Sequence, residues 1–237
     1  MTIRILAILI FVAVQASQLY FIAFLQNWTP LGIDTGPPSP MLRAALSNCA
    51  LLALFGFVHS LMARPAFKKR LYGMVPHRLE RSIYTLVSGA LLAMIVLCWT
   101  PMPEELWRIE SRSGVLAMYA AFAFGNLLLV WAIQSIDLWH FYGLRQAFSP
   151  AAPEPAFSTR GPYRFVRHPV QTGLIIALWA TPVMSIGHVL LAAFLTLYSV
   201  VATLFLEERE LDRMLGETYG NYRRTVPALL PFFPPRR

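Results

Sequence analysis

Residues 169–206 read PVQTGLIIALWATPVMSIGHVLLAAFLTLYSVVATLFL, and these 38 residues contain no Asp, Glu, Lys or Arg. A single helix of that length would measure about 57 Å, whereas the hydrocarbon core of a membrane is about 30 Å thick. The stretch must therefore fold back on itself. The residues around Gly187 predict the turn, because glycine lacks the backbone restrictions of other residues. Arg167-His168 and Glu207-Glu208 are then neighbours at one membrane surface.

The start of this hairpin has the features of an anion-binding site. Pro169 suits the first position of a helix, where its missing N–H costs nothing, and the free amides of that helix end point toward the same place. Two carboxylates then face Arg167 and His168. The alternative is that the basic pair anchors the chain at the interface and that the acidic residues continue a solvated helix.

The composition is that of an integral membrane protein. Of the 237 residues, 57% are hydrophobic and 14% are charged, and the mean hydropathy is +0.53; soluble chains carry about a quarter charged residues. The net charge of +8 comes from short loops between apolar runs, which argues against nucleic-acid binding. Cys49 and Cys98 lack disulfide or metal spacing, so no metal site is expected.

Apolar runs predict an all-α protein with about six transmembrane helices. The first run stays apolar to Leu25, which favours a retained anchor over a cleaved signal peptide. Residues 1–136 are expected to form a four-span membrane region, and residues 137–237 a core made of a cytoplasmic loop, the hairpin 169–206 and a cytoplasmic tail. The runs are Ile3–Leu25, Met41–Met62, Ser82–Thr100, Ser113–Ile136, Pro169–Ser185 and His188–Leu206.

The basic residues predict the orientation. If the amino terminus is cytoplasmic, seventeen of the twenty Lys and Arg residues lie inside, and only Arg43, Arg108 and Arg112 lie outside. This satisfies the positive-inside rule, so both termini are expected in the cytoplasm and the hairpin mouth opens there.

The motifs at the hairpin ends resemble a known family. Arg160-Gly161-Pro162-Tyr163, Val166-Arg167-His168-Pro169 and Gly173 are similar to the signature of the isoprenylcysteine carboxyl methyltransferase superfamily, as is the ending from Glu207-Glu208 to Val226-Pro227. The resemblance implies a cytoplasmic pocket for S-adenosylmethionine. Gln171 and Leu215 depart from the usual Tyr and Phe and put details of the pocket in doubt. The implied cofactor-binding residues are Tyr163, Arg167, His168, Pro169, Glu207, Glu208, Tyr219 and Tyr222.

Three further motifs resemble the methanethiol S-methyltransferase branch of that superfamily, and NnrU proteins share the first. They are His59-Ser60 with Ala63-Arg64, Glu80-Arg81-Ser82 with Tyr84, and Gly143-Leu144-Arg145-Gln146. This resemblance implies an enzyme of the bacterial inner membrane that converts methanethiol to dimethyl sulfide. The alternatives are methylation of a prenylcysteine carboxylate or other lipophilic acceptor, and a non-catalytic NnrU-like protein.

A thiol acceptor needs help to lose its proton, because an ordinary thiol has a pKa near 8.5 or above. Arg145 or Arg64 is expected to hold the thiolate, and His140 or a carboxylate to receive the proton. His59 is a further catalytic candidate, with a helix–helix hydrogen bond as the alternative. The expected partners are a small thiol and membrane lipid, with no nucleic acid and no obligate protein partner.

Overall fold

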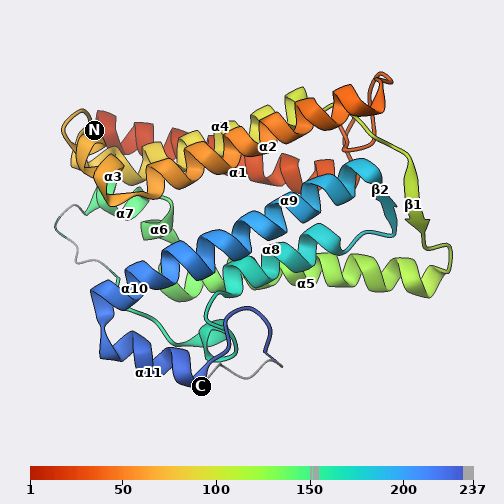
Figure 1. Ribbon diagram of the computed structural model, residues 1–237. Helices are drawn as coiled ribbons and strands as arrows, with labels where there is room; N and C mark the ends of the chain where they lie inside the picture. Colours follow the sequence, from red (N-terminus) through yellow and green to blue (C-terminus); the bar gives the residue numbers. More distant parts are fainter. Residues whose placement is uncertain (150, 152–154, 232–237) are drawn as a thin grey trace. The chain divides into compact units, whose positions relative to one another are not determined.

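The computed structural model describes residues 1–149, 151 and 155–231, so the tail residues Arg236 and Arg237 lie outside the described part. The described chain is almost entirely helical (Figure 1), which confirms the predicted fold class. Two short strands, β1 (Glu105–Arg108) and β2 (Val183–Ser185), pair with each other. The helices are α1 (Thr2–Leu25), α2 (Met41–Ala63), α3 (Pro65–Tyr72), η1 (His77–Leu79), α4 (Glu80–Cys98), α5 (Arg112–Ile136), α6 (Leu138–Phe141), α7 (Leu144–Phe148), η2 (Gly161–Arg164), α8 (Pro169–Trp179), α9 (Ile186–Ala202), η3 (Thr203–Glu207), α10 (Glu208–Leu215) and α11 (Glu217–Thr225).

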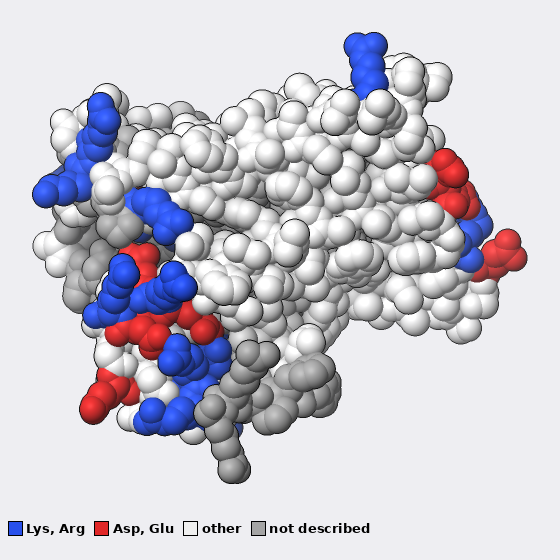
Figure 2. Space-filling view, viewed as in Figure 1, with Lys and Arg blue, Asp and Glu red and all other residues white. Residues whose placement is uncertain are grey.

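Five helical segments of the described chain are long and apolar enough to cross a membrane. They are Thr2–Leu25, Met41–Ala63, His77–Cys98, Arg112–Ile136 and Ile186–Leu215. Figure 2 shows a largely uncharged surface, as expected of helices that face lipid. The chain is thus an integral membrane protein.

The hairpin differs in one respect from its prediction. The run expected at 169–185 becomes α8, whose 11 residues are about 16 Å long and so do not reach across the hydrocarbon core. The helix ends before Pro182, which has no N–H to donate and disfavours helical geometry at Thr181. The chain therefore reverses over residues 180–185 rather than 185–188, and α9 already begins at Ile186.

The chain forms two compact units. Unit 1 comprises Met1–Leu106, Leu138–Pro155 and Met184–Leu191, and unit 2 comprises Trp107–Asp137, Ala156–Val183 and Ala192–Arg237. Both units draw on distant parts of the sequence. The functional division expected at residue 136 stays a prediction.

In unit 1, α1 packs along α4, and α4 also packs along α2 (Figure 1). Gly89 allows the close approach of α1, because a Cβ there would lie 3.3 Å from a methyl carbon of Val14. Ser17 donates a hydrogen bond of 2.7 Å to the Gly89 carbonyl. Small residues at such crossings are typical of helix pairs in membranes.

In unit 2, α5 and α8 pack backbone to backbone (Figure 1). A Cβ on Gly173 would lie 2.5 Å from the carbonyl oxygen of Gly125, and a Cβ on Gly125 would lie 2.7 Å from that of Gly173. Neither position can hold a larger residue without separating the helices. This contact fixes α8, and with it the residues that precede α8, against α5.

Candidate active site

The segment before α8 is held by the carboxy-terminal part of the chain. The Arg167 amide donates to the Pro227 carbonyl at 2.8 Å, and the His168 amide donates to the Ala228 carbonyl at 3.1 Å. Thr172, in the first turn of α8, donates its hydroxyl to the Leu229 carbonyl at 2.8 Å. These bonds satisfy backbone groups that no regular element pairs, and they place both side chains at the start of α8.

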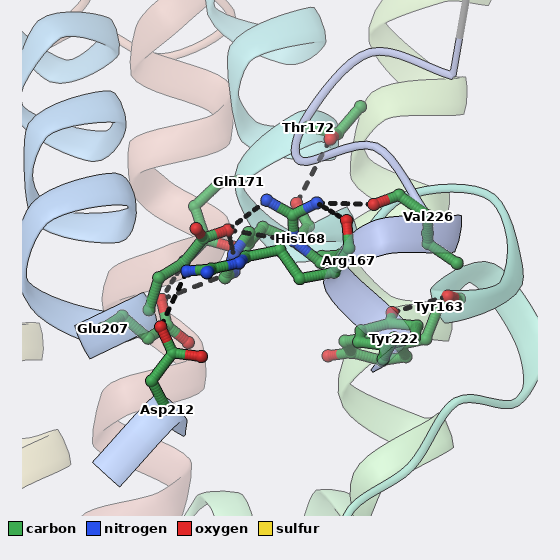
Figure 3. A network of polar contacts seen from close by, with 11 residues as sticks. Tyr163, Arg167, His168, Gln171, Thr172, Glu207, Asp212, Tyr222 and Val226 are labelled. Carbon is green, nitrogen blue, oxygen red and sulfur yellow. Dashed lines mark hydrogen bonds and ion pairs between the residues drawn. The ribbon is translucent and has the colours of Figure 1, made fainter. Parts of the chain in front are cut away.

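Arg167, labelled in Figure 3, forms a buried ion pair with Glu208 across the hairpin mouth. Arg167 Nε donates to Glu208 Oε1 at 2.9 Å, and the Nη2 group reaches the same oxygen. The guanidinium also donates to the carbonyls of Val226 and Arg223. The two residues are 8% and 7% exposed, so the charges are desolvated and depend on each other.

His168 lies between two carboxylates and is 3% exposed. Its Nε2 is 3.1 Å from Glu208 Oε1, and its Nδ1 is 3.6 Å from Glu207 Oε2. Gln171, one turn further along α8, donates to Glu207 Oε2 at 3.4 Å. The structure therefore brings together the two ends of the 38-residue apolar stretch. Unlike Glu208, the side chain of Glu207 is 48% exposed and remains open to a cationic ligand.

A π-helical turn includes Glu207 and ends directly before Glu208. The helix that begins as α9 widens over η3, Thr203–Glu207, and continues as α10 from Glu208. A π turn shifts the following side chains by about one residue position, or about 100°, relative to a regular helix. The buried side chain of Thr203 lies in this turn. The altered register sets which face of the helix presents Glu208 to Arg167.

Pro169 begins α8, as expected, with His168 as the residue that caps its start. The Thr172 amide donates to the His168 carbonyl at 3.0 Å. Pro169 has no N–H, so the free amides of the first turn are those of Val170 and Gln171, which point toward the amino-terminal end of the helix, where negative charge is favoured.

An aromatic group adjoins the ion pair. The Tyr222 hydroxyl donates to the Tyr163 carbonyl at 2.6 Å (Figure 3), which ties α11 to η2. The Tyr219 and Tyr222 rings are 6.1 Å apart, and the Phe157 ring lies 6.0 Å and 5.4 Å from them, respectively. Sequence motifs did not single out Phe157. In the sequence, Phe157 is marked only by its position shortly before Gly161-Pro162-Tyr163. An aromatic residue at such a distance from a motif is too common to indicate a role in the site.

These phenols stay neutral at ordinary pH. Burial raises the pKa of Tyr222 to about 12, although the nearby Arg167 charge opposes the shift. Burial also raises the pKa of Tyr163, and the negative charge of Glu207 adds to the increase. The pKa of Tyr219 is raised by burial and by Glu208. The group can donate hydrogen bonds and present ring faces to a cation, but it supplies no negative charge.

The other predicted site residues lie in unit 1. His59, in α2, is bonded through both ring nitrogens to α4. Ser88 donates its hydroxyl hydrogen to the Tyr84 carbonyl, so its oxygen accepts from His59 Nδ1 at 3.0 Å. The Tyr84 hydroxyl then donates to His59 Nε2 at 2.9 Å. The expected helix–helix hydrogen bond of His59 is therefore present.

The short helices α6 and α7 are docked on the rest of unit 1. Gly143, between them, has φ +85°, and a Cβ there would lie 2.5 Å from the Ser82 amide nitrogen. The Arg81 Nε donates to the Phe141 carbonyl at 2.9 Å. Gln146 Nε2 lies 3.1 Å from His140 Nδ1 and donates to the His140 carbonyl at 3.3 Å. These contacts hold the His140 ring against Gln146.

The two arginine candidates differ in surroundings. Arg64 directly follows α2 and is exposed, whereas Arg145 lies in α7 and is partly exposed. The cofactor candidates all belong to unit 2, and the four candidates for thiol activation all belong to unit 1. Among the described residues, no group of three or more His, Cys, Asp or Glu side chains is placed to hold a metal ion.

Comparison with known proteins gives consistent results. The model of the family described as phospholipid methyltransferase matches residues 114–218. Methanethiol S-methyltransferase 2 of Bradyrhizobium diazoefficiens is 38% identical over 230 residues, covering 95% of this chain and 88% of that protein. The methanethiol S-methyltransferase of Mycobacterium tuberculosis is 36% identical, covering 86% and 84% of the two chains. Nurim of Xenopus laevis is 32% identical over 167 residues, covering 64% of this chain and 57% of that protein. No solved structure matches.

Proposed function

The chain belongs to the family of the methanethiol S-methyltransferases and is a membrane methyltransferase; from this premise we propose that it methylates methanethiol to dimethyl sulfide with S-adenosylmethionine as donor. The observation that carries the proposal is the similarity to methanethiol S-methyltransferases along 95% of the chain. It includes the amino-terminal part of the sequence, which lies outside the phospholipid methyltransferase match.

A methyl donor is required in any methyltransferase, and the residues at the hairpin mouth suit S-adenosylmethionine. This cofactor combines a carboxylate, an ammonium group and a sulfonium cation. The first-turn amides of α8 suit the carboxylate, and the half-exposed Glu207 suits the ammonium group, while His168 holds the carboxylates of Glu207 and Glu208 in place. The ring faces of Tyr219, Tyr222 and Phe157 suit the sulfonium. When bound, the cofactor supplies an electrophilic methyl group.

Arg167 and Glu208 have a positioning role in this proposal. Each is nearly buried: Arg167 donates to Glu208 and to backbone carbonyls, and Glu208 Oε1 accepts from Arg167 and lies 3.1 Å from His168 Nε2. They therefore lock the helix that carries Glu207 against the segment that carries His168. Pro169, Tyr163 and the Tyr222 hydroxyl complete this frame from α8, η2 and α11.

The acceptor must lose a proton. The S–H bond of methanethiol breaks, its sulfur forms a bond to the transferred methyl carbon, and the products are dimethyl sulfide, S-adenosylhomocysteine and a proton. We propose that Arg145 binds the thiolate of methanethiol, with Arg64 as the second candidate, because a nearby guanidinium stabilises the thiolate relative to the thiol. His140 is the proposed proton acceptor, and His59 is the second candidate. Gln146 Nε2 lies 3.1 Å from His140 Nδ1 and 3.5 Å from its Nε2, which keeps the imidazole ring in place.

A water-poor site suits this reaction. A thiolate and a sulfonium combine into neutral products, so charge disappears along the reaction coordinate. Removing water destabilises the charged reactants more than the transition state, because the transition state carries less separated charge. We further propose that both termini, and with them the mouth of the hairpin, face the cytoplasm of a bacterial inner membrane, because seventeen of the twenty Lys and Arg residues then lie inside.

A headspace assay tests the proposal. Membranes containing the protein receive S-adenosylmethionine and methanethiol, and dimethyl sulfide is measured by gas chromatography. We expect product with the wild type and background with Arg167→Ala. Activity toward a prenylcysteine or a phospholipid, with none toward methanethiol, would refute the acceptor. No transfer to any of the three would refute the proposed function.

A further inference from the structure

The loop between α2 and α4 in unit 1 is strongly basic. Between the end of α2 at Ala63 and Glu80, the chain has no Asp or Glu. It carries five Lys and Arg residues, and we call residues 64–78 the basic segment. In Figure 2, blue side chains gather over α3, which forms the first part of this segment. The five residues are Arg64, Lys68, Lys69, Arg70 and Arg78.

The protein supplies no counter-charge to these side chains within its described residues. None of the five has an ion pair or a side-chain hydrogen bond there. The nearest carboxylate in sequence, Glu80, is 7% exposed and lies 3.3 Å from His77. By contrast, the exposed Arg223 pairs with Asp212 at 2.7 Å. Within the described residues, no carboxylate therefore balances the positive charge of the basic segment.

The segment lies where a membrane surface must be. It connects two helices that are each long and apolar enough to span, Met41–Ala63 and His77–Cys98. Leu79 packs in a small apolar cluster with Ala7 of α1 and with Leu144 and Ala147 of α7. The amino-terminal end of α1 is therefore at the same end of unit 1, and the basic segment adjoins three helix ends.

The basic segment also offers apolar contacts. Met74 is 78% exposed within it, and the Phe67 side chain of α3 is partly exposed. Basic side chains interspersed with apolar ones are typical of segments that lie in the headgroup region, with the apolar groups directed to the acyl boundary. A dissolved anion would satisfy the charges but not the exposed methionine.

We propose that the basic segment is a binding site for anionic phospholipids. Lys and Arg donate charge-assisted hydrogen bonds to headgroup phosphates, and several such residues close together select anionic lipids over zwitterionic ones. Met74 contacts the upper acyl chains. The site lies outside the residues assigned to the cofactor and, Arg64 apart, outside those assigned to the thiol.

Lipid retention tests this proposal without reference to methyl transfer. The protein is reconstituted into nanodiscs of phosphatidylglycerol and phosphatidylcholine, released, and the lipids that stay bound are quantified by native mass spectrometry. We expect the wild type to retain phosphatidylglycerol in excess of its share. In Lys69→Gln/Arg70→Gln, the excess should fall by about fivefold for each charge removed.

A matched control removes two other exposed charges. Arg43→Gln/Arg112→Gln changes the first turns of α2 and α5 and should leave the excess of phosphatidylglycerol unchanged. The proposal would be overturned if both double variants lost the same amount of bound phosphatidylglycerol. It would also be overturned if the wild type retained no excess of phosphatidylglycerol. The proposal would also be overturned if inorganic phosphate raised the melting temperature of the wild type while lipid composition had no effect on it. The site would then bind a free anion rather than a lipid. Unchanged melting temperatures exclude misfolding as the cause.

Discussion

The change Glu208→Gln isolates the charge of the buried pair. Glutamine has nearly the same shape as glutamate and still offers one oxygen to Arg167 Nε, which lies 2.9 Å from Glu208 Oε1. The guanidinium charge of Arg167, only 8% exposed, loses its partner. His168 also loses the charged oxygen that lies 3.1 Å from its Nε2.

The magnitude follows from these contacts. Removing one partner of a buried ion pair costs about 3–5 kcal/mol. Arg167 keeps its bonds to the Val226 and Arg223 carbonyls, so the lower end of that range, about 3 kcal/mol, is expected. If cofactor binding requires the ordered cluster, the dissociation constant of S-adenosylmethionine should rise about 150-fold.

Titration calorimetry in detergent measures the affinity, and unfolding in mixed micelles measures the stability. Asp212→Asn is the matched control, because it breaks an ion pair of 2.7 Å whose side chains are 47% and 36% exposed. An exposed pair contributes about 1 kcal/mol or less, so the control should bind the cofactor almost as the wild type does. Unchanged affinity in Glu208→Gln, or equal losses in both variants, would refute the reasoning.

Further predictions concern the acceptor, the helix contact and the aromatic group. The rate of dimethyl sulfide formation should fall from wild type to Arg145→Lys to Arg145→Ala. The activity of the Ala variant should recover as the pH rises toward the pKa of the thiol. If Arg145→Ala instead lowers the affinity for the cofactor, Arg145 belongs to the cofactor pocket and does not bind the thiolate. Gly173→Val should lower the free energy of unfolding by about 3 kcal/mol or more. Gly220→Ala should not lower it, because a Cβ there would lie 4.0 Å from the end of the flexible Arg224 side chain; equal melting temperatures of the two variants would contradict this. Tyr222→Phe should lose about 1 kcal/mol through its bond to Tyr163. Because burial raises the pKa of Tyr222 to about 12, the loss should be constant below about pH 9 and shrink only above the unfolded pKa of about 10; a loss that varies between pH 6 and 8 would argue against a neutral phenol.

The elements predictable from the sequence are those fixed by apolar length and charge. A stretch of 38 residues without charge forces a reversal, so the meeting of Arg167 with Glu208 follows from arithmetic. The position of the reversal depends on Pro182, which interrupts the helix within an otherwise uniformly apolar run. The turn predicted around Gly187 is therefore wrong, because Gly187 lies in α9.

Other features have no local signal. The bonds from Arg167 and His168 to the carbonyls of residues 227 and 228 join two irregular segments, and irregular segments have no periodicity to read. Phe157 joins the aromatic group only because η2 and α11 meet at the Tyr222 hydroxyl. The contact of Gly125 with Gly173 depends on which faces of two apolar helices meet, and uniform hydrophobicity hides those faces.

Transfer of an isotopically labelled methyl group tests the central claim most directly. Purified protein in lipid nanodiscs is given methanethiol and S-adenosylmethionine whose sulfonium methyl is trideuterated, and the headspace is analysed by mass spectrometry. We predict dimethyl sulfide with one deuterated and one ordinary methyl group, formed in step with S-adenosylhomocysteine. Unlabelled dimethyl sulfide, or label found only in lipid, would contradict the account.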